Sequence, residues 1–199
     1  MVDKTIPHRH MIMRMDAPQP RRATLPDGFR FDTYRDGDDL AWAKMEHYAG
    51  DFRTVEIALG YFRSEYLTRR EEVEKRMIIV RNDRDEAVCS CMAWNTFRND
   101  RRCPCLQWLV TAEGYEGMGL ARAVAAETVN RFVAMEEKPV YLHTQPWSYK
   151  AVWLYYQMGF RICRRDTFQT FVNQCDEALP IMATLLPEEK QFILSDLTE

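Results

Sequence analysis

The chain has 199 residues, 46% of them hydrophobic and 12% aromatic, and its 27 basic and 30 acidic residues give a net charge of −3. This apolar area predicts a folded domain with a sizeable core and excludes disorder throughout. The slight acidic excess argues against a general nucleic-acid-binding protein. The sequence lacks any apolar run of about 18 residues, so we expect no membrane-spanning helix.

Residues 1–28 contain four prolines separated by basic residues and show no regular period. Because proline has no backbone N–H, we expect an extended arm on the protein surface. Residues 1–14 have no apolar stretch of the secretory type, which favours a cytoplasmic protein with reduced cysteines. His8 and His10 leave a metal-binding interpretation open, against the favoured alternative of a solvated tail.

The first half of the chain predicts one strand, two helices and a hairpin. Alternation at 29–34 indicates a strand, and the turn Asp36-Gly37 followed by Asp38 indicates a helix to about residue 48, with Asp38 as N-cap. Thr54 is expected to cap a second helix. Its apolar face comprises Val55, Ala58, Leu59, Phe62 and Tyr66. The apolar runs 77–80 and 87–94 flank a polar turn and predict a β-hairpin.

The second half alternates strands and helices. A strand at 106–111 leads through a glycine-rich turn into a long helix that Pro139 ends. A strand at 140–144, a helix ended by Gly159 and a strand from residue 160 follow. Residues 176–197 are predicted to be helical, with an interruption at Pro187. Because hairpins precede the βαβ units, we expect an α/β fold with a central mixed sheet flanked by helices.

The turn before the long helix is a candidate anion-binding site. Gly117 and Gly119 leave backbone N–H groups unshielded by side chains, and the helix N-terminus adds a partial positive charge. These features indicate a site for phosphate or pyrophosphate, with a turn and helix cap that bind no ligand as the alternative. The turn is not a P-loop, because no Lys-Ser/Thr follows it, and the preceding hairpin excludes a dinucleotide-binding fold.

Residues 106–160 resemble the GNAT N-acetyltransferase superfamily in two motifs. The pattern Gln/Arg-x-x-Gly-x-Gly/Ala is matched at Glu116, Gly119 and Ala121. The pattern Ala-x-x-Leu-Tyr-x-x-x-Gly-Phe is matched at Ala151, Leu154, Tyr155, Gly159 and Phe160. The resemblance implies a GNAT-type acyl-CoA N-acyltransferase fold over residues 29–175, with the 1–28 arm before it and a helical tail, 176–199, packed on it.

The resemblance also implies acetyl-CoA as co-substrate, with no metal. Backbone groups of Leu109, Val110 and Thr111 would pair with the pantetheine arm. The amides of the turn and the helix start would hold the pyrophosphate. The cofactor-binding set is therefore Leu109, Val110, Thr111, Glu116, Gly117, Met118, Gly119, Leu120, Ala121, Arg122 and Ser148. Glu116 and Met118 depart from the family pattern, in which a Gln or Arg and a basic residue are usual.

Two catalytic residues are expected. Tyr155 matches the tyrosine that family members use as general acid, and a phenol with a pKa near 10 can protonate a leaving thiolate. The alternative for Tyr155 is a core aromatic residue. His143 is the candidate general base, since histidine titrates near neutrality, and the alternative is a hydrogen-bonded strand histidine. Glu113 is a weaker candidate base.

The expected reaction is direct transfer of an acetyl group from acetyl-CoA to a primary amine in a ternary complex. Trp147, Gln145, Tyr61 and Phe62 are the candidate substrate-binding residues, and Tyr61 and Phe62 have core packing as their alternative. The acceptor is expected to be a small-molecule or peptide amine, with neither nucleic acid nor membrane as partner, and a homodimer is compatible with the sequence. The alternative function is a non-catalytic acyl-CoA sensor or interaction module.

One Cys-x-Cys pair, Cys89 and Cys91, lies in the strand predicted at 87–94, and a second, Cys103 and Cys105, directly precedes the strand predicted at 106–111. If these strands pair about position 97, Cys89 lies opposite Cys105 and Cys91 opposite Cys103. Four thiols on one face could bind zinc or form disulfides. The alternative is that these cysteines are small buried apolar residues.

Overall fold

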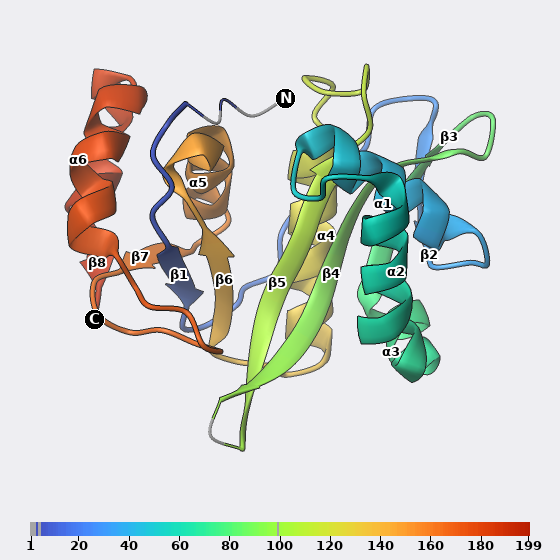
Figure 1. Ribbon diagram of the computed structural model, residues 1–199, viewed down its shortest axis with the longest axis horizontal. Helices are drawn as coiled ribbons and strands as arrows, with labels where there is room; N and C mark the ends of the chain where they lie inside the picture. Colours follow the sequence, from blue (N-terminus) through green and yellow to red (C-terminus); the bar gives the residue numbers. More distant parts are fainter. Residues whose placement is uncertain (1–2, 4, 99) are drawn as a thin grey trace. The chain divides into compact units, whose positions relative to one another are not determined.

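The computed structural model describes residue 3, residues 5–98 and residues 100–199. The chain divides into two compact units. The first comprises Pro20–Trp94 and Gln107–Arg131, and the second comprises Asn95–Leu106, Phe132–Glu199 and the described residues up to Gln19. Strands β4 (Ala87–Arg98) and β5 (Arg101–Thr111) contribute to both units. The strands pair in the order β2-β3-β4-β5-β6-β1-β7-β8, with both parallel and antiparallel neighbours, which confirms the predicted mixed sheet (Figure 1).

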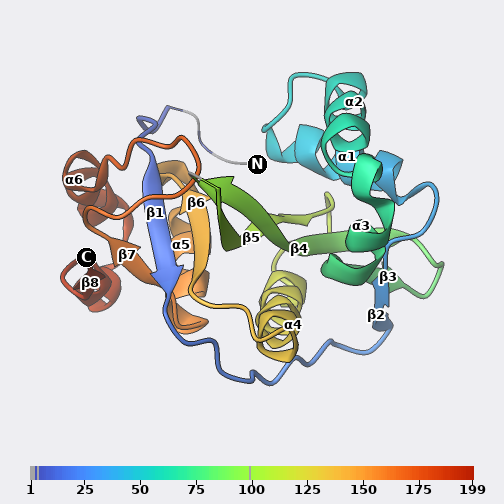
Figure 2. The same cartoon turned by 90° about the horizontal axis from the view of Figure 1, so that it is seen from below.

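In the first unit, β2 (Phe29–Thr33) and β4 pair antiparallel with β3 (Met77–Asn82), so the predicted hairpin is confirmed. Helices α1 (Asp38–Ala49) and α2 (Val55–Glu65) cover one face, and α4 (Leu120–Ala134) covers the other (Figure 2). Between α2 and β3 lie η1 (Leu67–Arg69) and α3 (Arg70–Arg76). Alternating side chains of β4 contact the elements on opposite faces of the sheet. The Cys91 side chain forms a hydrogen bond with Thr128 of α4, whereas the Trp94 ring packs on Tyr66, which follows α2.

The helix starts in this unit test the capping predictions. Thr54 caps α2 as expected, because its hydroxyl accepts the N–H of Ile57 at 3.3 Å. Asp38 is not the N-cap of α1. That position is Gly37, which has a left-handed backbone with a φ of 94°. Asp38 instead accepts hydrogen bonds from the backbone N–H of Arg35 and from the buried guanidinium of Arg81.

In the second unit, β6 (Val140–Thr144) pairs in parallel with β5 at Cys105–Tyr141. The helical elements are η2 (Pro146–Ser148), α5 (Tyr149–Gln157), α6 (Cys175–Leu185) and η3 (Glu188–Leu194). The last two confirm the helical stretch interrupted at Pro187. Strands β7 (Arg161–Cys163) and β8 (Leu197–Thr198) pair in parallel. The boundaries at residues 28 and 175 stay predictions.

The expectation of a surface arm is wrong for β1 (Met11–Met15). This strand pairs antiparallel with both β6 and β7, and Met11, Ile12 and Met13 are fully buried. Successive residues Met11, Ile12 and Met13 are all buried, so the start of β1 is an apolar run rather than the alternation that marks a half-exposed strand. Residues 1, 2 and 4 of the predicted arm lie outside the described residues.

The cysteine pairing expected from a register about position 97 is also wrong. The N–H of Ala112 donates to the carbonyl of Val88 at 2.8 Å, and Cys89 Sγ lies 3.3 Å from Thr111 Oγ1. This pairing is centred on residue 100 rather than 97. Cys89 therefore faces Thr111 and not Cys105.

All six cysteines are buried free thiols. Burial raises the pKa of Cys89 and of Cys91 to about 12, so both remain protonated at neutral pH. Within the described part of the chain, no group of three or more His, Cys, Asp or Glu residues could hold a metal ion. The described helices also include none with the length and apolar character needed to cross a bilayer.

Candidate active site

The first unit contains the glycine turn between β5 and α4. Gly114, Gly117 and Gly119 have φ values of 81°, 79° and 85°, a region that other residues rarely adopt. A Cβ atom at Gly117 or Gly119 would meet no described atom within 4 Å, so backbone conformation and not crowding requires these glycines. Helix α4 begins directly after them at Leu120, and its first N–H groups lack intrahelical acceptors. The turn therefore has the backbone geometry of an anion site.

Glu116 has a structural role that the sequence did not indicate. Its carboxylate accepts the N–H of Gly114 at 2.8 Å and a hydrogen bond from Tyr48 of α1. Desolvation opposes ionisation, but bonds from its own N–H, from Tyr48 and from Gly114 outweigh it and lower the pKa of Glu116. The carboxylate is thus charged at neutral pH and braces the turn. Met118 and Arg122, beside it, are exposed.

A backbone irregularity in β5 precedes this turn. Trp108 has a φ of 55° within the strand, which is rare for a non-glycine residue and concentrates at functional sites. It interrupts the regular alternation just before Leu109, Val110 and Thr111, the residues predicted to pair with pantetheine. No propensity in the sequence marks this position. Its ring contacts Trp42 and Tyr61 at centroid distances of 5.4 and 5.7 Å.

The two aromatic residues predicted to contact substrate from α2 differ in their surroundings. Tyr61 is half-buried beside Trp108 and Phe52, so it lies at the irregular part of β5. Phe62 is fully buried between Tyr34 and Trp42, at centroid distances of 5.8 and 4.9 Å. The burial of Phe62 agrees with the core alternative, and its substrate contact stays a prediction.

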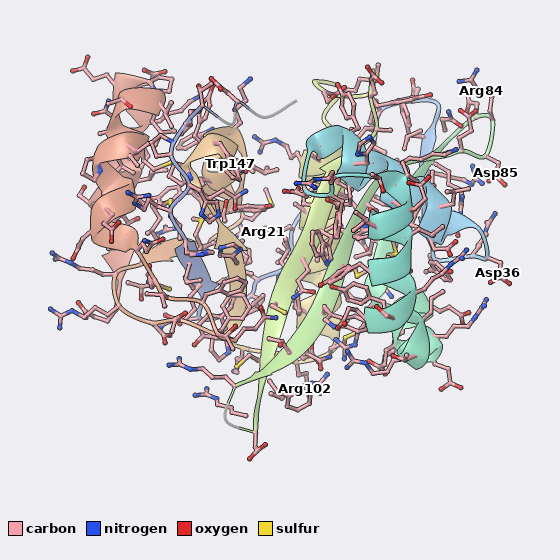
Figure 3. The ribbon with its side chains drawn as sticks, viewed as in Figure 1. Arg21, Asp36, Arg84, Asp85, Arg102 and Trp147 are labelled. Atoms are coloured by element: carbon pink, nitrogen blue, oxygen red, sulfur yellow. The ribbon has the colours of Figure 1, made fainter. Side chains whose placement is uncertain are left out.

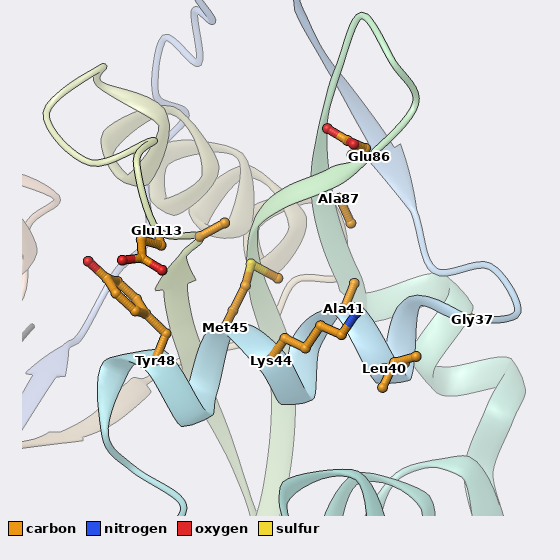
Figure 4. Close-up of a pocket in the computed structure, with 10 residues that line it drawn as sticks. Gly37, Leu40, Ala41, Lys44, Met45, Tyr48, Glu86, Ala87 and Glu113 are labelled. Atoms are coloured by element: carbon orange, nitrogen blue, oxygen red, sulfur yellow. The ribbon is translucent and has the colours of Figure 1, made fainter. Parts of the chain in front are cut away.

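The first unit also has a pocket of about 500 Å³ between α1, the β3–β4 hairpin and the residues after β5 (Figure 4). Glu113, the alternative base, lines this pocket with Tyr48 and Lys44. The hydrogen bond to Glu116, desolvation and the charges of Glu116 and Glu113 raise the pKa of Tyr48. Tyr48 therefore links the pocket wall to the glycine turn.

The second unit contains Tyr155, on α5. Tyr155 is 8% exposed and shares the buried face of the helix with Val152 and Met158. Its ring meets Phe160 edge-on at 6.2 Å. Burial fixes the position of the phenol, which a general acid requires, although burial alone also suits a core residue. Its assignment as the acid stays a prediction.

His143 lies on β6 and is largely buried. Its ring stacks on Phe171 with a centroid distance of 3.9 Å and an interplanar angle of 6°. Desolvation, followed by the nearby His10 and His8, lowers the pKa of His143 to about 3. The imidazole is therefore neutral at pH 7, and its general-base role stays a prediction.

The contact of His10 with the predicted base was not expected from the sequence. Its Nδ1 lies 2.8 Å from His143 Nε2, and the His8 ring meets Trp147 at 4.9 Å. The interpretation of a solvated tail is wrong for these two histidines, which are half-buried. The signal that would have found them is the neighbouring β1 strand, whose antiparallel pairing with β6 places residue 10 near residue 143.

The residues after β6 form a short hydrogen-bonded turn. Gln145 Nε2 donates to Ser148 Oγ at 3.0 Å. Ser148 occupies the N-cap position of α5 but makes no side-chain cap bond. Trp147 is half-buried in η2 at the start of α5 (Figure 3). The substrate roles of Gln145 and Trp147, and the coenzyme role of Ser148, stay predictions.

The strand order and the glycine turn that leads from β5 into α4 define the class of acyl-CoA N-acyltransferase folds. The model of the acetyltransferase (GNAT) family matches residues 40–160, which is more than half of the chain. The chain therefore belongs to the GNAT acetyltransferase family. No match was found among curated protein sequences.

Solved structures agree with this fold. A GCN5-related N-acetyltransferase from Sphaerobacter thermophilus is 20% identical, with a TM-score of 0.58 over 78% of this chain and 48% of that chain. An acetyltransferase from Streptococcus agalactiae is 16% identical, with a TM-score of 0.54 over 74% of this chain and 92% of that chain. The chain spans about half the length of the first of these proteins. At such identities, the likeness shows the fold alone.

Proposed function

We propose that the protein transfers an acetyl group from acetyl-CoA to a primary amine, by direct transfer in a ternary complex. The observation that carries this proposal is the positive-φ glycine turn at the start of α4, in a chain of the GNAT family. A backbone site of this kind suits a pyrophosphate because N–H groups and the helix dipole both favour negative charge. The acceptor is a small-molecule or peptide amine, and the protein acts in the cytoplasm.

The amides of Gly117, Gly119 and Ala121 would hold the pyrophosphate, and backbone groups at Leu109–Thr111 would pair with pantetheine. Acetyl-CoA supplies the thioester whose acyl carbon the amine attacks. Because the proposed contacts are made by the backbone, the departures at Glu116 and Met118 leave them in place. Glu116 is moreover engaged by Gly114 and Tyr48 within the turn.

His143 accepts a proton from the ammonium form of the acceptor, which leaves the lone pair that forms the new N–C bond. Tyr155 donates its phenolic proton to the sulfur that leaves when the C–S bond breaks, and solvent later restores the phenol. Each proton transfer contributes on the order of 10²–10⁴-fold to the rate. Tyr61, Gln145 and Trp147 are proposed to position the acceptor.

A thermal-shift titration with acetyl-CoA, coenzyme A and ATP tests the binding step. A ligand at 100 times its Kd adds about 2.7 kcal/mol to the free energy of unfolding, which raises Tm by several degrees. We expect such a rise with both coenzymes and none with ATP. The absence of a shift with either coenzyme would contradict the proposed site.

An amine screen that detects released thiol tests the transfer step. We expect thiol release that depends on both acetyl-CoA and an amine, with mass spectrometry showing the acetylated acceptor. Coenzyme binding without turnover across small amines and peptides would instead favour the sensor function.

A further inference from the structure

The N-terminal strand brings a second imidazole to the predicted base. Strand β1 pairs with β6 in a register that sets Met11 opposite Thr144 and Ile12 opposite His143. His10 directly precedes β1, and its Nδ1 lies 2.8 Å from His143 Nε2. This distance is that of a hydrogen bond, in which one ring nitrogen donates and the other accepts.

Gln174 holds the backbone of His10 in place. The His10 N–H donates to Gln174 Oε1 at 3.0 Å, and the N–H of Gln174 donates to the His10 carbonyl at 2.8 Å. Two bonds from one residue, just before α6, fix both peptide groups of His10. These backbone hydrogen bonds help to hold the His10 ring in one position, as a proton-transfer partner requires.

Ring contacts continue from this pair toward the N-terminus. Phe171 stacks on His143 and contacts His10 at 5.6 Å. His8 meets the His10 ring edge-on at 4.6 Å and Trp147 at 4.9 Å. The three histidines thus follow one another in the order His143, His10, His8, and aromatic rings cover the first and the last.

The burial of His143 poses a chemical problem for a simple base. Burial and the adjacent histidines hold its pKa near 3, so a protonated His143 is unfavourable at neutral pH. A neutral imidazole can still pass a proton on, because it accepts at one nitrogen while it gives up the proton on the other. Such a transfer needs an acceptor on the second nitrogen, and His10 occupies that position.

We propose that His10 is the proton acceptor behind His143, so that the two histidines act as a relay in the proposed acetyl transfer. His143 Nδ1 takes the proton from the ammonium form of the acceptor amine, and the proton on His143 Nε2 passes to His10 Nδ1. His143 ends neutral, His10 becomes an imidazolium, and the amine is left with the lone pair that attacks the acyl carbon. His10 then releases its proton to solvent. The relay rests on the proposed acetyltransferase function.

The charges around the pair permit this step. The segment that holds His10 contributes Arg9, which forms an ion pair at 2.6 Å with Glu177 of α6. His8 and His10 are the titratable groups facing His143 from the N-terminal segment, and Phe171 and Trp147 are uncharged. The positive charge of Arg9 is therefore paired before the proton arrives at His10.

The test compares the His10→Gln and His10→Ala variants with the wild type. Glutamine keeps a hydrogen-bonding group but cannot carry a proton. We expect kcat of His10→Gln to fall about 10–100-fold at pH 6.5, within the range of acid–base contributions. The defect should shrink toward pH 9, because a larger share of the amine is then already neutral. Added imidazole should raise the rate of His10→Ala but not that of His143→Gln.

The matched control is His47→Gln, an exposed histidine of the first unit, which should keep the wild-type rate at every pH. Melting curves and coenzyme A shifts check that each variant is folded. A His10→Gln variant with the wild-type rate, or with the same defect at all pH values, would overturn the relay. If the wild type itself neither binds coenzyme A nor acetylates an amine, the proposed function fails, and the relay fails with it.

A measurement without acetyl-CoA or amine gives an independent readout. Imidazole ¹⁵N spectra of the wild type should show His143 neutral from pH 8 to pH 5, with a proton shared between His143 Nε2 and His10 Nδ1. This signal should disappear in His10→Gln and persist in His47→Gln. A His143 ring that is already protonated at pH 6 would contradict the relay.

Discussion

The candidate sites of the two units consist of different parts of the polypeptide. In the first, the candidate anion site consists of backbone groups held by positive-φ glycines and the start of α4. In the second, the candidate proton-transfer groups are the side chains of Tyr155 and His143, which burial and ring contacts hold in place. A backbone site tolerates changes in neighbouring side chains, whereas a side-chain site loses its chemistry with one substitution.

The departures from the family motif illustrate this difference. Glu116 replaces the usual Gln or Arg, yet its carboxylate binds Gly114 and Tyr48 and stabilises the turn. By contrast, the role proposed for His143 requires an imidazole, and the neutral state of that ring depends on its surroundings. Substitutions in the two units should therefore separate binding from turnover.

The largest effect is expected at Gly119. Gly119→Glu adds a negative side chain to a turn proposed to hold pyrophosphate and strains a φ of 85°. We expect the Kd for coenzyme A to rise at least about 100-fold, which corresponds to about 2.7 kcal/mol. Calorimetric titration measures it. The control Gly119→Ala carries the same strain without the charge and should bind more tightly than Gly119→Glu; equal Kd values would mean that strain alone is responsible.

Tyr155→Phe removes the phenolic proton and keeps the ring. We expect kcat to fall about 100-fold when chemistry limits the rate, with an unchanged Kd for coenzyme A. The neighbouring Tyr156→Phe is the matched control, since the Tyr156 hydroxyl donates a hydrogen bond to Asp196, between η3 and β8. Similar rates for the two variants would remove Tyr155 as the acid.

His143 should give the protein a marked sensitivity to acid. Its folded-state pKa of about 3 lies below the ordinary 6.5, so between these values the unfolded chain binds more protons and stability falls as the pH falls. The slope cannot exceed about 1.4 kcal/mol per pH unit from this one group. Denaturation curves from pH 7 to pH 4 should show a shallower slope for His143→Gln than for the wild type or His47→Gln.

The smallest effect concerns the buried Glu46 of α1, whose Oε1 has no hydrogen-bond partner among the described residues. Desolvation, then the charge of Asp51 and a hydrogen bond with it, raise its pKa well above the usual value. The unfolded chain releases this proton first, so stability is lost as the pH rises above about 4.5. Glu46→Gln should therefore raise the free energy of unfolding at pH 8 by about 1–3 kcal/mol and change it little at pH 4. Melting curves at the two pH values measure this as a rise in Tm at pH 8 alone.

The exposed Glu56 of α2 provides the contrast for Glu46. Bonds from its own N–H and from Thr54 lower the pKa of Glu56, so Glu56→Gln should not stabilise the protein at pH 8. A Tm gain of the same size in both variants would show that overall charge, and not burial of Glu46, is responsible.

Local signals explain what the sequence could predict. Thr54 predicts the start of α2 because a hydroxyl at the N-cap accepts a hydrogen bond from an otherwise unpaired N–H. The polar residues at 82–85 predict the β3–β4 turn. The glycine turn and Tyr155 were found from the spacing of two motifs. These features are encoded within a few neighbouring residues.

The missed features depend on residues distant in the chain. The burial of β1 follows from its place between β6 and β7, and the His10–His143 contact follows from the same pairing. The register of β4 against β5 is seen only in contacts between residues far apart in the sequence, such as the hydrogen bond from Ala112 to Val88. No local pattern marks the left-handed conformation of Trp108, whose ring packs on Trp42 and Tyr61 from other parts of the chain.

The place of β1 has a consequence for how the protein is made. Met13 leaves the ribosome well before its partners Leu142 and Ile162, which follow it by more than a hundred residues in the sequence. Until they emerge, an apolar segment with unpaired backbone groups stays exposed, which makes the nascent chain prone to aggregation. Pairing over so long a sequence separation also slows folding. The second unit can therefore close only after Ile162 has been synthesised, whereas the β2–β3–β4 meander of the first can pair much earlier.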